Sequence, residues 1–149
     1  MISPNFTTAF AVARTADEAA NAIKNPRGWW SQAIEGPTEK PGDEFTYRYR
    51  DVHRCNIKVV EVVAQKKIVW QVLDNYFSFT EDKTEWKGTK LIFEIAGKGD
   101  QTEVRFTHEG LVPDYECYGM CSNAWGTYIN GSLRRLITTG KGSPNPKEE

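Results

Sequence analysis

Apolar residues between Asp114 and Thr139 recur at the spacing of one helical face, so this segment is predicted to form a long C-terminal helix. At 100° per residue, one narrow stripe contains Tyr118, Trp125, Ile129 and Leu136. The stripe is flanked by Cys121 and Ser132 on one side and by Tyr115 and Leu133 on the other. The opposite face is polar and carries Asn123, Thr127, Asn130 and Arg134. We therefore expect the rest of the chain to pack against this stripe.

Shorter segments alternate apolar and polar residues with a period of two, which is typical of strands with one buried face. The predicted strands are Asn5–Ala13, Glu44–Arg50, Cys55–Val63, Lys67–Asn75, Thr89–Ala96 and Thr102–His108. The third and fourth of them are joined by Ala64, Gln65 and Lys66, which predicts a hairpin. The segment Tyr76–Lys87 is rich in aromatic residues but has no clear period, so no element is predicted there.

Two short helical elements are predicted between the first two strands. Thr15 followed three residues later by Glu18 is a capping box for a helix over Ala16–Lys24. Pro26 ends that helix, and Arg27 to Trp30 form a short helical turn. Because adjacent side chains point in different directions, we expect one of Trp29 and Trp30 to close over the core and the other to lie nearer the surface.

The order of these elements predicts an α+β fold with a curved antiparallel sheet of about six or seven strands around the long helix. The length of 149 residues suits one domain, which we place at residues 1–140. Residues 141–149, KGSPNPKEE, have nothing to bury and are predicted to form a flexible polar tail.

Composition narrows the classes of function. The formal net charge is -1, which argues against a nucleic-acid partner. The sequence contains no apolar run of about 18 residues, so membrane insertion is not expected. The first ten residues do not resemble a signal peptide, and the three cysteines have no disulfide-framework spacing, so we expect a cytoplasmic protein. The five tryptophans are many for this length and indicate an aromatic core or cavity.

Several motifs then identify a family resemblance that covers roughly residues 5–140. They are Trp29-Trp30, Ile68-Val69-Trp70, Trp86-x-Gly88-Thr89, Thr107-His108-x-Gly110-Leu111 and Cys121-x3-Trp125-x2-Tyr128 followed by Ser132-Leu133. In this order they resemble the activator-of-heat-shock-ATPase homologue branch of the START/polyketide-cyclase-like (SRPBCC, helix-grip) superfamily. The resemblance implies a sheet that grips the C-terminal helix, with a hydrophobic cavity between them. Members of the superfamily bind lipids, hormones or polyketides, and some are enzymes.

The candidate binding site is an aromatic cavity between the sheet and the long helix. Its walls would be formed by two groups of side chains. One group points inward from the strands, as their alternation predicts, and the other lies on the buried face of the helix. They are Trp30, Phe45, Tyr47, Tyr49, Trp70, Phe93, Phe106, His108, Tyr118, Cys121 and Trp125. Tyrosine and tryptophan suit such a site because each combines a large apolar area with one polar group. The alternative is a solid core built from the same residues.

His108 is the candidate catalytic residue because it shares the inward face of its strand with Val104 and Phe106. Next to Tyr47 or Tyr118, a neutral histidine can exchange a proton with a bound molecule. The alternative is a structural histidine whose hydrogen bonds are satisfied within the core.

Two other clusters of polar side chains are candidate sites for an ion. Cys117 and Cys121 lie one helical turn apart and, with His108 and either Cys55 or His53, can be read as a zinc site, but we expect no metal. Arg48, Arg50, His53 and Arg54 form either an anion-binding cluster or a solvated strand face, and we favour the solvated face.

The sequence lacks the phosphate-loop, dinucleotide, zinc-protease and nucleophile-elbow motifs, so no cofactor is expected. The predicted function is therefore binding of a small hydrophobic, aromatic or lipid-like molecule in the cavity. Two alternatives remain: a cyclase or hydrolase that uses the same cavity, and a co-chaperone with a heat-shock ATPase as partner. The oligomeric state is not predicted.

Overall fold

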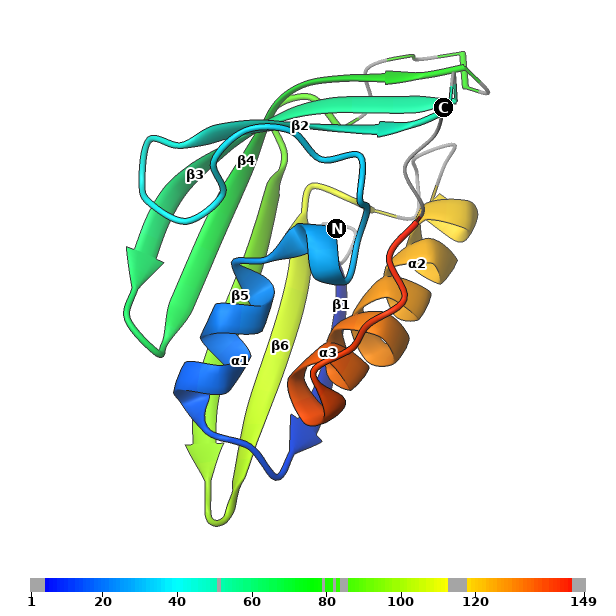
Figure 1. Ribbon diagram of the computed structural model, residues 1–149. Coiled ribbons are helices and arrows are strands. Elements are labelled where there is room, and N and C mark those ends of the chain that lie inside the picture. The colour runs from blue at the N-terminus through cyan, green and yellow to red at the C-terminus, as the bar shows by residue number, and fades with distance from the viewer. Residues whose placement is uncertain are drawn as a thin grey trace.

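The computed structural model describes residues 5–50, 52–78, 80–81, 83, 86–112 and 118–145. It contains one antiparallel sheet whose strands lie in the order β1-β6-β5-β4-β3-β2. The strands are β1 (Phe6–Val12), β2 (Glu44–Tyr49), β3 (His53–Val63), β4 (Lys67–Phe77), β5 (Lys90–Lys98) and β6 (Gln101–Glu109). The predicted α+β fold and its antiparallel sheet are confirmed, and the curved sheet packs one face against the helices (Figure 1).

The predicted capping box is present at the start of α1 (Ala16–Ile23). The Thr15 hydroxyl accepts a hydrogen bond from the Glu18 backbone N–H at 3.1 Å, and the Glu18 carboxylate accepts one from the Thr15 backbone N–H at 3.0 Å. A short 3₁₀ helix, η1 (Pro26–Gly28), follows and leads into the tryptophan pair. Both short helical elements therefore lie where the sequence predicts them.

The long helix contains a π-helical segment. It consists of α2 (Tyr118–Gly126), the π-helical η2 (Thr127–Leu133) and α3 (Arg134–Thr139). The Arg134 N–H bonds the carbonyl oxygen of Ile129, five residues earlier. Part of the segment predicted as helix, residues 113–117 with Tyr115 and Cys117, lies outside the described residues.

The π-helical segment changes which side chains the helix buries. Buried residues follow one another at intervals of four, at Cys121, Trp125, Ile129, Leu133 and Ile137. In an α-helix this spacing drifts by about 40° at each step, but the wider turn of a π-helix keeps such residues on one face. The predicted stripe is therefore wrong at its C-terminal end. Leu136 is only partly buried, and Ile137 occupies the core position instead.

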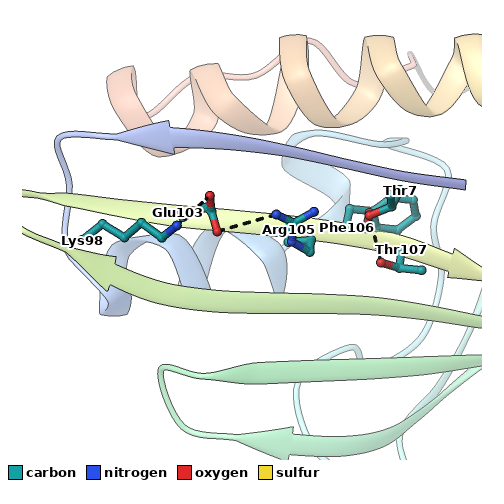
Figure 2. Close-up of polar contacts among 6 residues, drawn as sticks. All are labelled: Thr7, Lys98, Glu103, Arg105, Phe106 and Thr107. Carbon is teal, nitrogen blue, oxygen red and sulfur yellow. Dashed lines mark hydrogen bonds and ion pairs between the residues drawn. The ribbon is translucent and has the colours of Figure 1, made fainter.

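The outer face of the sheet is polar, as the alternation of β6 predicts. Glu103 lies between Lys98, at 3.4 Å, and Arg105, at 3.9 Å (Figure 2). The Thr7 hydroxyl donates to the Phe106 carbonyl oxygen at 3.0 Å and lies 3.1 Å from the hydroxyl of Thr107. Val104, Phe106 and His108 point from the same strand into the core.

The sheet opens at one end, where β4 extends beyond its pairing with β5. The pairing covers only Lys67–Gln71 against Lys90–Glu94, whereas β3 stays paired with β4 as far as Phe77. Two register shifts, at Asn56/Ile57 and Val59/Glu61, interrupt the β3–β4 ladder. Irregularities of this kind bend a strand pair, so β3 and β4 curve relative to the strands beside them. This leaves an opening between the strand ends and the start of the long helix.

Residues 141–145 differ from the predicted flexible tail, because they are held by hydrogen bonds. The last described residues run back along the long helix (Figure 1). Asn145 exchanges backbone hydrogen bonds with the Trp30 carbonyl and the Gln32 N–H, both at 2.9 Å. The Ser143 N–H donates to the hydroxyl of Ser132 at 2.7 Å. Residues 146–149 lie outside the described part of the chain. None of the described helices is long and apolar enough to cross a membrane.

Candidate functional site

The centre of the fold is filled by aromatic rings. Trp29, Trp30 and Trp70 are nearly parallel, with ring centroids 6.0–6.5 Å apart. Both tryptophans of the adjacent pair are buried, at 0% and 1% exposed, so the expectation that one of them lies nearer the surface is wrong. The reason is that η1 turns the chain so that both rings enter the core, where each stacks on Trp70.

Four of the predicted cavity residues belong to this filled core. Phe45 and Phe93 pack on Trp70 at centroid distances of 5.1 and 4.9 Å, and Phe106 packs on Phe93 at 5.1 Å. All four side chains are 2% exposed or less. For these residues the structure shows the alternative that the sequence left open, a solid aromatic core.

An apolar pocket of about 230 Å³ lies at the open end of the sheet, between the strand ends and α2. Five of the predicted residues line it: Trp30, Tyr47, Tyr49, Cys121 and Trp125. Tyr118 is partly buried at the start of α2 but does not line this pocket. His108 also lies outside the lining, on the far side of Trp125 and Trp86.

The rest of the lining was not predicted. It comprises Val52, His53, Phe77, Trp86, Met120, Ala124 and Tyr128. His53 could have been found from parity, because it shares a strand face with the buried Cys55 and Ile57. Phe77 and Trp86 gave no such signal, since both lie in the segment Tyr76–Lys87, which has no clear period. Met120 is 62% exposed, which places it at the entrance.

His108 is held by hydrogen bonds on both ring nitrogens. Its Nδ1 accepts the indole N–H of Trp125 at 3.0 Å, and its Nε2 lies 2.8 Å from the Thr89 hydroxyl oxygen. The Thr89 hydroxyl donates to the Trp86 carbonyl oxygen at 2.6 Å, so Nε2 carries the hydrogen and donates to Thr89. Burial lowers the pKa of His108 to about 3, with a further contribution from His53. With its lone pair already used, this neutral imidazole is not placed to act as a base on a pocket ligand.

His53 forms part of the pocket wall. Its ring packs edge-on against Tyr47 at 5.1 Å and Trp86 at 4.6 Å, and its Nε2 lies 3.0 Å from the Cys55 sulfur. Burial lowers the pKa of His53 to about 3, so the ring is neutral at physiological pH. His53 is therefore an uncharged aromatic component of the wall.

The phenol of Tyr47 stays protonated. Burial raises its pKa, and the neighbouring Tyr128 raises it further. The Tyr128 hydroxyl oxygen accepts a hydrogen bond from the Asn145 side-chain amide at 2.8 Å. With His53 neutral, the lining among the described residues contains no charged side chain. The pocket therefore offers apolar surface and neutral polar groups, but no counter-ion.

Two arginines of the candidate anion cluster lie on the other face of the sheet from His53. Arg48 and Arg54 are cross-strand neighbours on the exposed face, whereas His53 is buried on the other face, so it does not join an anion cluster. Arg50 lies in the turn after β2, with its guanidinium 5.5 Å from the Tyr49 ring centroid. Within the described part of the chain, no group of three or more His, Cys, Asp or Glu side chains is placed to hold a metal ion. Cys117 lies outside the described residues.

Comparison with known proteins places this geometry in a family. The family model described as "Activator of Hsp90 ATPase homolog 1-like protein" matches residues 22–138. No match is found among curated protein sequences.

Similar solved structures support the same fold. The Aha1 dimer from Colwellia psychrerythraea gives a TM-score of 0.75 and 23% identity, over 95% of this chain and 100% of that one. MLL2253 from Mesorhizobium loti gives a TM-score of 0.67 and 13% identity, over 89% and 96%. CalU16 from Micromonospora echinospora gives a TM-score of 0.64 and 12% identity, over 92% and 75%. At these identities the likeness is one of fold.

Proposed function

Because the chain belongs to the family of Activator of Hsp90 ATPase homolog 1-like proteins, within the helix-grip superfamily, we propose that it binds a small hydrophobic or aromatic molecule. The observation that carries this proposal is the apolar pocket of about 230 Å³ between the strand ends and α2. Concave apolar pockets with a few convergent polar groups are the usual sites for small molecules. In this pocket the polar groups include the hydroxyls of Tyr47, Tyr49 and Tyr128.

The site favours binding over catalysis. A general base needs a free lone pair within reach of the reacting proton. The Nδ1 lone pair of His108 is occupied by Trp125, and the phenol of Tyr47 keeps its proton because its pKa is raised. The cyclase or hydrolase alternative, in which His108 acts together with Tyr47 or Tyr118, therefore has no support in this arrangement, since His108 and Tyr118 also lie outside the pocket lining.

Filling the pocket should abolish binding. Ala124 lines the pocket from α2, so Ala124→Phe places a ring inside it, whereas Asn123 is exposed on the same helix. Trp30, Trp86 and Trp125 all line the pocket, so a bound ligand should quench tryptophan fluorescence. We expect a saturable change with at least one member of a panel of polycyclic aromatics, flavonoids and lipids, an at least tenfold loss of that affinity in Ala124→Phe, and no change in Asn123→Phe. Equal binding by both variants would place the ligand elsewhere.

A second candidate function follows from the family description, which names activation of an Hsp90 ATPase. The similar structure from Colwellia psychrerythraea is likewise that of an Aha1 dimer. If this chain acts in that way, the purified protein should stimulate ATP hydrolysis by a purified Hsp90. Because such an effect would depend on the outer surface, Ala124→Phe should leave it unchanged. An ATP hydrolysis rate that stays at its basal value over a full titration would rule the candidate out.

A further inference from the structure

We propose that the pocket selects an uncharged, planar ligand of one or two fused rings that carries a hydrogen-bond acceptor. This inference rests on the proposed binding function and names the class of ligand. Its support comes from four features of the pocket: its volume, the orientation of its rings, its lack of charge and its spare hydrogen-bond donors.

The volume limits the size of the ligand. An apolar cavity of about 150 Å³ accommodates benzene, and pockets for drug-sized ligands begin at about 300 Å³. A pocket of about 230 Å³ lies between these values and suits one or two fused rings. It does not continue into the fold, because the stacked Trp29, Trp30 and Trp70 fill the space behind it. A long acyl chain or a four-ring sterol would not be enclosed.

The walls favour a flat ligand. Trp30 and Tyr47 stack at a centroid distance of 4.3 Å with 19° between their planes, and Trp86 and Trp125 stack at 5.6 Å with 14°. All four rings contribute to the lining. Planar rings gain from offset-stacked and edge-to-face contacts with such walls, whereas a flexible chain loses conformational entropy on entry.

The lining disfavours a charged ligand. A buried ion needs an opposite charge or several hydrogen bonds to replace its hydration. Tyr47, Tyr49 and Tyr128 bring only hydroxyls, and His53 is a neutral ring. Among the described residues of the wall, no side chain can serve as a counter-ion to a carboxylate or an ammonium group.

The pocket has hydrogen-bond donors to spare. Tyr47 and Tyr128 lie within hydrogen-bonding reach of each other, so one hydroxyl can donate to the other while the second hydrogen stays available. The Tyr128 oxygen already accepts from Asn145, which directs its hydrogen elsewhere. The Trp86 indole N–H, which is also buried at the wall, has no acceptor within the described part of the chain. An acceptor such as a carbonyl or ring oxygen would satisfy one of these donors.

Four probes separate these requirements. Coumarin is a neutral, planar, two-ring lactone with an acceptor; naphthalene matches its shape without one. 2-Naphthoate adds a negative charge, and octan-1-ol replaces the rings by a chain. Dissociation constants would be measured by isothermal titration calorimetry at pH 7.5. We expect coumarin to bind at least tenfold more tightly than 2-naphthoate and octan-1-ol, and severalfold more tightly than naphthalene.

Variants test the donors. The double variant Tyr47→Phe/Tyr128→Phe removes both hydroxyls and should weaken coumarin binding about tenfold while leaving naphthalene binding unchanged. The single variant Tyr128→Phe should have a smaller effect, because the freed Tyr47 hydrogen can still donate. Tyr76→Phe removes a hydroxyl outside the pocket and is the matched control, since Tyr76 packs beneath the Arg54 guanidinium. Urea unfolding of each variant checks that the fold is retained.

The outcomes separate this inference from the proposed function. If octan-1-ol or 2-naphthoate binds as tightly as coumarin and Ala124→Phe abolishes that binding, the binding function stands and the inference is overturned. The same holds if the double variant binds coumarin normally. If none of the four probes binds, the inference is overturned, whereas the proposed function fails only if the titration with polycyclic aromatics, flavonoids and lipids also gives no saturable change.

Discussion

Replacing Trp30 by alanine should lower the free energy of unfolding by about 3–5 kcal/mol. Trp30 is 1% exposed and packs among five aromatic rings, at centroid distances from 4.3 Å to Tyr47 to 6.5 Å to Trp70. Its removal takes away this buried area and leaves a cavity that rigid neighbouring rings cannot fill. Urea unfolding followed by circular dichroism measures the change.

Trp30→Phe is the matched variant, because it keeps a ring in contact with Tyr47 and leaves a smaller cavity. It should cost less than half as much as Trp30→Ala. A loss below about 1 kcal/mol for Trp30→Ala would show that Trp30 does not hold the core together. That result would restore the interpretation in which one tryptophan of the pair lies near the surface.

Acidification should destabilise the protein between pH 6.5 and 5. The chain has only two histidines, and burial lowers the pKa of each to about 3. The unfolded chain binds these protons near pH 6.5, so below that pH it holds more protons than the folded protein. Stability is then lost as the pH falls, by roughly 1 kcal/mol per histidine for each pH unit. Above pH 7 the histidines contribute no pH dependence.

Urea unfolding at pH 7.5, 6.5, 5.7 and 5.0 tests this expectation, because free carboxyl groups titrate mainly below this range, near pH 4. His108→Gln keeps one donor and one acceptor but removes one titrating group, so it should reduce the slope by about half. A free energy of unfolding that stays constant from pH 7.5 to 5.0 would contradict the burial of neutral histidines. The imidazole resonances of the folded protein should likewise show no titration above pH 5.

The sheet was predictable because local alternation decides which face of a strand is buried. Val104, Phe106 and His108 point inward by parity alone, and the Thr15 and Glu18 capping box depends on residues three apart. Features that depend on contacts between distant parts of the chain could be predicted less well from the sequence. The predicted buried stripe of the long helix is wrong after Ile129. It was calculated with the spacing of an α-helix, and the π-helical segment changes that spacing.

The sequence indicates which aromatic residues face inward, but not which of them line the pocket. Parity shows that a side chain points inward, but not whether the space in front of it is filled. Trp70 and Phe93 point inward into a packed stack, whereas Tyr47, which is also buried, lines the pocket. The difference arises from the place where β4 leaves β5, a property of strand pairing that no single segment encodes.

The π-helical segment Thr127–Leu133 also restricts how the chain length can vary. Restoring α-helical bonding over the same number of residues would rotate everything after it by about 100°, because the π-helical segment holds about one residue more than an α-helix would. Ile137 would leave the core, and Ser132, which donates to the Trp29 carbonyl oxygen and accepts from Ser143, would lose its partners. A relative with a regular α-helix here should therefore lack one residue in this stretch, whereas other changes in length should accumulate in surface turns such as Lys98–Asp100.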